Sequence, residues 1–214
     1  HYRKQFPLLF KYLDTHKDLS IQLHPNDALA KKRHNSFGKT EMWYVMQADE
    51  KARIIVGFKE DSTKEEYLNH IHSKNLLSIL NEVPVKKGDV FFLETGTIHA
   101  IGAGIVIAEI QQTSDVTYRI HDFDRVDAQG NTRELHIDWS LDAINYQSNS
   151  SKVNYKKEEN KSNTLVDCPF FKTNLIPLNG ILSIEKTNDS FVVFMCTEGA
   201  FDLHLGSESY HYKT

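Results

Sequence analysis

The chain has 214 residues, of which 40% are hydrophobic and 25% charged, a composition typical of a globular protein with one large domain or two small ones. Its formal net charge of -4 leaves no general basic surface, so nucleic acid is not an expected partner. Apolar runs such as residues 105–108 and 191–195 have the length of strands and are too short to cross a bilayer, so no membrane partner is expected. Two cysteines without CxxC spacing favour reduced thiols and a cytoplasmic location.

The N-terminal part of the chain predicts short strands separated by turns. Residues 19–24 alternate apolar and polar side chains with the period of a half-buried strand, and Pro25 ends that alternation. Residues 28–33 predict a helical turn. The strands expected in this part are residues 6–13, 19–24, 41–46 and 52–58.

A helical segment is expected next, at about residues 63–81. The run Ser62-Thr63-Lys64-Glu65 has the Ser-x-x-Glu capping pattern that opens a helix, and a break is expected near Asn75. Its apolar face comprises Tyr67, Leu68, Ile71, Leu76, Ile79 and Leu80.

The remainder of the chain is mainly β, with one further helix expected at residues 135–146. The strands expected here are residues 90–93, 98–100, 105–111, 118–121, 170–176, 181–185, 191–196 and 200–205. Many short strands with frequent turns indicate sandwiches or barrels. The sequence therefore predicts a metal-binding β-rich half at residues 1–146, a polar linker at 147–164 and a second, incomplete β-rich half at 165–214.

Four side chains are candidate ligands for a divalent metal. Gln22 and His24 are two apart on one predicted strand and therefore share a face near its end. Glu41 opens an aromatic strand, and His99 follows a glycine turn that directs it inward from a corner. Alone, each is explained as well by a polar surface residue, a charge at a strand edge or a buried structural histidine. Together, two imidazoles, an amide and a carboxylate without a thiolate fit an open metal site.

Four segments resemble type I mannose-6-phosphate isomerases of the short bacterial form, which belong to the cupin superfamily. They are residues 19–27, 38–44, 96–102 and 109–119. The resemblance implies cupin-type (jelly-roll) β-barrels with a small helical insertion, and covers residues 6–146 strongly. It also implies a zinc-dependent aldose–ketose isomerase that interconverts mannose 6-phosphate and fructose 6-phosphate by enediol proton transfer. The chain opens and closes abruptly, as a fragment does, because family strands are expected before His1 and after Thr214.

The resemblance also implies roles for individual residues. One zinc ion per chain would be held by Gln22, His24, Glu41 and His99, and Arg119 matches an active-site arginine. Lys39 would bind the substrate, and Glu109 and Asp115 would line the same pocket. The general base stays open between Glu109, Asp115 and a metal-bound water. Lys39 is equally explained as a solvated lysine, and Asp115 as an ion-pair partner of Arg119.

The sequence is compatible with two other functions. A cupin iron oxygenase would use His24, Glu41 and His99 as a two-histidine, one-carboxylate triad, although Lys39 and Arg119 favour a small phosphorylated sugar as the ligand. A sugar-phosphate sensor would keep the fold without catalysis. We expect a monomer or a weak homo-oligomer. The remaining histidines that could be confused with ligands are interpreted as polar surface residues: His34, His70, His72, His121 and His136.

Overall fold

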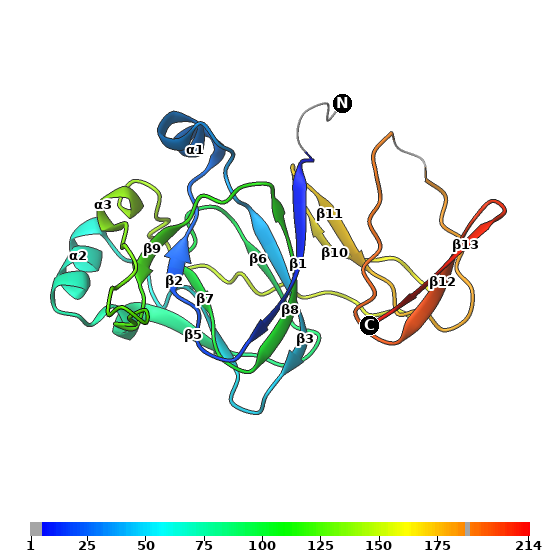
Figure 1. The fold of residues 1–214 in the computed structure, drawn as a ribbon, viewed down its shortest axis with the longest axis horizontal. Helices are drawn as coiled ribbons and strands as arrows, with labels where there is room; N and C mark the ends of the chain where they lie inside the picture. The colour runs from blue at the N-terminus through cyan, green and yellow to red at the C-terminus, as the bar shows by residue number, and fades with distance from the viewer. Residues whose placement is uncertain (1–5, 187–188) are drawn as a thin grey trace. The chain divides into compact units, whose positions relative to one another are not determined.

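The structure, a computed structural model, describes residues 6–186 and 189–214. Its described part is mainly β, as predicted, with two larger antiparallel sheets and two hairpins (Figure 1). The described residues form two compact units. One contains the chain up to Asn154 together with Leu165–Thr173, and the other contains Tyr155–Thr164 and Asn174–Thr214. Residues of the predicted linker, 147–164, are thus divided between the two units.

The first unit contains the two larger sheets. The four-stranded sheet has the order β1-β8-β3-β6, formed by Leu8–Thr15, Ile105–Gln112, Glu41–Ala48 and Val90–Leu93. The five-stranded sheet has the order β5-β4-β7-β2-β9, formed by Leu80–Pro84, Arg53–Phe58, His99–Ile101, Ile21–Leu23 and Tyr118–His121. All the pairings are antiparallel, as a jelly roll requires.

Alternation along the strands gives the five-stranded sheet two different faces. One face meets the four-stranded sheet in a cluster that includes Trp43 and Phe91 from one sheet and Val56 from the other. The opposite face carries Ile21 and Leu23 and is covered by the helical segments (Figure 1). Because neighbouring strand residues point to opposite faces, Gln22 is directed between the two sheets.

The helices agree with the expected positions, with two corrections. They are α1 (Asp27–His34), α2 (Lys64–His72), the 3₁₀ helix η1 (Leu76–Ile79) and α3 (Ile137–Ser140). The N-cap of α2 is Thr63, one residue later than the capping pattern suggested, while the Ser62 hydroxyl donates to the Glu66 side chain. The predicted break near Asn75 separates α2 from η1.

The helix expected at residues 135–146 is much shorter than predicted. Only Ile137–Ser140 is helical, and the backbone N–H of Asn145 donates to the Gly96 carbonyl at 3.0 Å. This contact with a distant turn replaces the local hydrogen bond that would have continued the helix. None of the described helices has the length and apolar character needed to cross a membrane.

The remaining strands are β10 (Asn163–Asp167), β11 (Lys172–Leu175), β12 (Ala200–Leu205) and β13 (Glu208–Lys213). They pair as β10 with β11 and β12 with β13. Residues 181–185 and the range 191–196 were predicted as strands but are irregular. Ile181, for example, is 94% exposed. An apolar run supplies side chains for a strand but not the neighbouring strand that its backbone must pair with.

Candidate metal centre and active site

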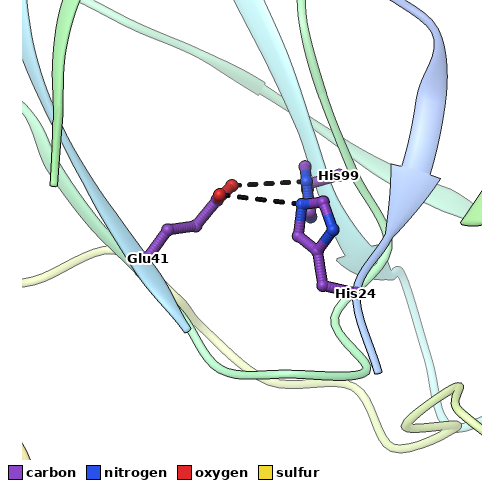
Figure 2. Close-up of side chains that lie close together, drawn as sticks. All are labelled: His24, Glu41 and His99. Atoms are coloured by element: carbon purple, nitrogen blue, oxygen red, sulfur yellow. Dashed lines mark ion pairs between the residues drawn. The ribbon is translucent and has the colours of Figure 1, made fainter. Parts of the chain in front are cut away.

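Three of the predicted metal ligands converge from separate strands of the first unit. His24 follows β2, Glu41 begins β3 and His99 begins β7. Their ligand atoms all lie within 4.8 Å of one another, and Figure 2 shows both imidazoles directed toward the carboxylate. His24 Nε2 lies 3.6 Å from Glu41 Oε2, and His99 Nε2 lies 3.3 Å from Glu41 Oε1. The described residues contain no other such group of three or more histidine, cysteine or acidic side chains.

A glycine turn brings two of these ligands together. Gly96 has a φ of 87°, a conformation that favours glycine, and its N–H donates to the His24 carbonyl at 2.8 Å. A Cβ at this position would lie 2.5 Å from the Ala143 carbonyl oxygen. The turn before His99 is therefore joined directly to the end of β2, as the glycine in the sequence suggested.

Hydrogen bonds orient both imidazoles for metal binding. His24 Nδ1 lies 2.8 Å from the Val116 carbonyl oxygen, and His99 Nδ1 lies 2.9 Å from the Thr97 carbonyl oxygen. Since a carbonyl only accepts, each Nδ1 carries the proton and each Nε2 keeps a free lone pair.

Three potential ligand atoms at the centre are buried and have no hydrogen-bond partner. They are His24 Nε2, His99 Nε2 and Glu41 Oε2. Polar atoms buried without a partner are costly, and native proteins rarely tolerate three in one place. A divalent cation between them would satisfy all three, so the residues present fit a metal.

Burial also sets the protonation states of the three ligands. It lowers the pKa of His24 well below its usual value and lowers that of His99 to about 4, so both imidazoles are neutral at pH 7. Burial, followed by the charge of Glu109, raises the pKa of Glu41 to about 8, against the opposing charge of Lys39. Neutral imidazoles keep the lone pairs that a cation needs, and a buried carboxyl group whose ionised form is disfavoured would be stabilised by a bound cation.

A small cavity of about 100 Å³ opens beside His99. Its walls come from both sheets and from the segments that lead into them: Lys11, Leu13, Leu19, Ser20, Gln22, Lys39, Trp43, His99, Ala100, Ile101 and Glu109. A larger cavity of about 390 Å³ lies between β4, β5, β6 and residues 148–152, and none of the predicted site residues lines it. The small cavity is the candidate active site, because His99 and several ionisable groups line it.

Gln22 lies directly opposite His99 in the β2–β7 pair and lines this cavity. Side chains of directly opposed residues share a face, so its amide lies beside the His99 imidazole. Its Oε1 accepts a 3.4 Å hydrogen bond from the Ser20 hydroxyl. The prediction that Gln22 is a fourth ligand is consistent with this position.

Lys39 is held against the metal ligands by the loop that precedes β3. It is 7% exposed, and its Nζ lies 3.5 Å from Glu41 Oε2. Asp27 Oδ1 accepts from the Gly38 N–H at 2.7 Å, and Gln112 Oε1 accepts from the Thr40 N–H at 2.9 Å. The loop is thus anchored on both sides, and Lys39 is no solvated surface lysine.

The sequence reasoning missed Lys11, which faces Glu109 across the β1–β8 pair. Its Nζ donates to Glu109 Oε1 at 2.9 Å and to Gln111 Oε1 at 2.5 Å, while Trp43 Nε1 donates to Glu109 Oε2 at 3.0 Å. Glu109 is thereby fixed in the cavity wall, as predicted for a pocket residue. A single lysine within the apolar run of residues 8–13 was the available signal.

Arg119 and Asp115 lie outside the small cavity. Arg119 is opposite Gln22 on β9, and its Nη1 donates to the Glu134 carbonyl at 3.0 Å. Burial and the charge of Arg133 lower its pKa. Asp115 is exposed, and no ion pair joins it to Arg119 among the described residues. Arg125 and Arg133 both pair with Asp122.

Comparisons with known proteins find relatives of this chain. Residues 1–67 match the family profile described as phosphomannose isomerase type I, catalytic domain. Mannose-6-phosphate isomerase ManA of Bacillus subtilis is 39% identical, with 98% of this chain and 67% of the relative covered. The chain belongs to the type I mannose-6-phosphate isomerase family. A mannose-6-phosphate isomerase of Streptococcus mutans is 41% identical over 96% of this chain, which spans 65% of that relative's length.

Solved structures of the isomerase family support the same fold. The mannose 6-phosphate isomerase from Bacillus subtilis superimposes with a TM-score of 0.86 at 31% identity, covering 98% of this chain and 67% of that one. The cupin-type fold predicted from the sequence is therefore confirmed. A variant of phosphomannose isomerase from Salmonella typhimurium, at 16% identity and a TM-score of 0.72, covers 98% of this chain and 72% of its own and shares the fold.

Proposed function

We propose that this chain carries the catalytic centre of a zinc-dependent mannose-6-phosphate isomerase acting in the cytoplasm. The observation that carries the proposal is the buried group of His24, Glu41 and His99, whose unpartnered nitrogen and oxygen atoms converge in a chain of the isomerase family. The chain spans about two thirds of its relatives, so the activity is proposed for the protein to which this centre belongs.

Zinc fits two of the separations between the ligand atoms, all of which lie within 4.8 Å of one another. Tetrahedral zinc with ligands at about 2.0–2.1 Å separates them by about 3.4 Å. The observed separations of 3.3 Å and 3.6 Å between the imidazole nitrogens and the carboxylate oxygens match this value. Gln22 would supply a further ligand from the cavity wall. When bound, the ion would act as a Lewis acid toward a carbonyl or hydroxyl oxygen of the sugar.

The proton transfer between C2 and C1 needs a base on the cavity wall. Glu109 and Lys11 form a hydrogen-bonded pair there, whereas Asp115 does not line the cavity. We assign proton removal and return to the Glu109 carboxylate, which hydrogen bonds from Lys11 and the Trp43 indole hold in place. Lys39, within 3.5 Å of Glu41, can donate to a sugar oxygen beside the ligands.

The phosphate requires cations at the edge of the site, and the arginines of β9 and of the segment after it are the candidates. Arg119 shares a sheet face with Gln22, and Arg125 Nη1 donates to the Asp18 carbonyl next to the cavity residue Leu19. Arg125 and Arg133 both pair with the carboxylate of Asp122 and are only partly exposed. Guanidinium groups match the geometry of a phosphate well.

Metal analysis combined with turnover tests the proposal. The protein is expected to hold zinc and to convert mannose 6-phosphate to fructose 6-phosphate, and His99→Ala should lose both properties together. A matched control is His70→Ala, which removes a histidine from α2 that contacts only its own helical region. A zinc-loaded, active His99→Ala variant would contradict the site. Iron with oxygen uptake would favour the oxygenase, and binding without turnover the sensor.

A further inference from the structure

His136 is bonded to the backbone of Arg119 in both directions. The Arg119 N–H donates to His136 Nδ1 at 3.1 Å, and the His136 N–H donates to the Arg119 carbonyl at 2.7 Å. The Arg119 side chain also reaches this segment, because its Nη1 donates to the Glu134 carbonyl at 3.0 Å. Three hydrogen bonds thus connect one residue of β9 to residues 134–136. The interpretation of His136 as a polar surface residue is wrong, since only 16% of its side chain is exposed.

These bonds lie at the outer edge of the sheet. β9 is the last strand and pairs with β2 only, with Arg119 opposite Gln22. Since the backbone N–H and C=O of Arg119 are both used toward His136, they point away from β2. Arg119 and Gln22 therefore form a non-hydrogen-bonded pair, the kind in which opposed side chains lie closest.

We propose that His136 is a positioning residue, which holds Arg119 in register with Gln22 through an unprotonated Nδ1. This inference rests on the proposed function, in which Arg119 contacts the substrate. Without such a partner, the backbone amide of an edge strand is exposed to water, and the backbone is less firmly held at that residue. A guanidinium on a loosely held backbone loses the alignment that catalysis requires.

The surroundings of His136 select the required tautomer and ring orientation. Nδ1 accepts the Arg119 N–H, so the ring proton is carried by Nε2, which lies 3.9 Å from Glu134 Oε2. The ring stacks on Trp139 with centroids 5.5 Å apart and an interplanar angle of 17°. The ring is thus held flat against the indole while its Nδ1 faces β9.

Two amide variants separate the acceptor from the bulk of the side chain. In His136→Asn the side-chain oxygen can occupy the position of Nδ1, whereas in His136→Gln it is displaced by one bond. We expect kcat to fall about tenfold to a hundredfold in His136→Gln, and to stay within about threefold of wild type in His136→Asn, because misalignment of a catalytic group has effects of this size. KM should change less than kcat. Equal losses in the two variants would overturn the inference.

A double-mutant cycle tests whether His136 acts through Arg119. In an Arg119→Ala background, which keeps the backbone amide, His136→Gln should change kcat by less than about twofold. The same loss in both backgrounds would show a general structural role and overturn the inference. His70→Gln is the matched control, because His70 also contacts a backbone carbonyl but lies on α2, and its kcat should not change.

Amide exchange of Arg119, measured by NMR on the zinc-loaded protein, provides a readout independent of activity. His136→Gln should speed this exchange and His136→Asn should not, because only the first removes the acceptor. If the wild-type protein proves inactive with mannose 6-phosphate, the proposed function fails, and the amide exchange still decides the contact. Unchanged exchange in His136→Gln would refute the contact even in an active enzyme.

Discussion

Burial of the Glu41 carboxyl group lowers the stability of the metal-free protein at neutral pH. Its carboxyl group is 1% exposed, and one of its oxygens lacks any hydrogen-bond partner. Burial first, and then the charge of Glu109, raise its pKa to about 8. Between pH 4.5 and 8 the metal-free folded protein therefore holds a proton on Glu41 that the unfolded chain releases. The contribution of Glu41 to the free energy of unfolding is thus full at low pH and is lost as the pH rises through 8.

Glu41→Gln should accordingly make the metal-free protein more stable at neutral pH. We expect an increase of about 2 kcal/mol in the free energy of unfolding relative to wild type at pH 7, shrinking at pH 5, because the amide cannot ionise. Urea denaturation in the presence of a chelator measures both values. With zinc added, the order should reverse, since the variant loses a ligand. A variant equally destabilised at both pH values would contradict the stated origin of the pKa shift.

Lys11 and Glu109 are expected to matter for turnover more than for metal binding. Lys11→Met keeps the aliphatic stem and removes the ammonium that holds Glu109 Oε1 at 2.9 Å. We predict a fall in kcat of at least about a hundredfold with zinc content unchanged, and a similar fall for Glu109→Gln. Steady-state kinetics with metal analysis on each variant test this. Full activity in both would remove the pair from the proton transfer.

At the level of elements, the turn after β9 is organised by one carboxylate. Asp122 is 6% exposed and accepts hydrogen bonds from both Arg125 and Arg133, the second at 2.7 Å between Arg133 Nε and Asp122 Oδ2. Hydrogen bonds from Arg133, followed by those from Arg125, lower the pKa of Asp122. The stabilisation is therefore present above the ordinary carboxyl range and is lost as pH falls through the lowered pKa.

Asp122→Asn should loosen this turn and with it the arginines at the edge of the site. We expect a loss of about 2 kcal/mol at pH 7, where the two guanidinium groups, each partly exposed, lose a charged partner. The loss should be smaller at an acid pH at which Asp122 is protonated in the folded state as well. Denaturation curves at the two pH values make the comparison. An undiminished difference at low pH would show that the charge is not responsible.

For the whole molecule, the metal is expected to stabilise only the unit that contains it. The three ligands follow or begin β2, β3 and β7. Of these strands, β3 belongs to the four-stranded sheet and the other two to the five-stranded sheet. Zinc should therefore slow amide exchange in these strands by about a hundredfold or more at ligand saturation. The β12–β13 hairpin belongs to the other compact unit and serves as the internal control. Equal slowing in both would contradict a stabilisation confined to the first unit.

Local patterns in the sequence were sufficient for the residues whose roles depend on strand alternation. Ile21 and Leu23 enclose Gln22, so the period of two already directed its amide away from the helical cover. The glycine before His99 marked the turn that leads into its strand, and the proline after His24 marked the end of the strand before it. The family segments then grouped these residues with Glu41, and the three ionisable ligands do converge in the structure.

These local patterns could not predict contacts between residues that are distant in sequence. Lys11 meets Glu109 across 98 positions of sequence, and His136 meets Arg119 through the outer edge of a sheet. The apolar run at residues 191–196 resembled a strand and is irregular, whereas Asp115 resembled a pocket residue and is exposed. Periodicity tells which face of an element a side chain occupies, because that depends on local backbone geometry. Which partner it meets there depends on how the sheets pair and pack, and that is a property of the folded chain as a whole.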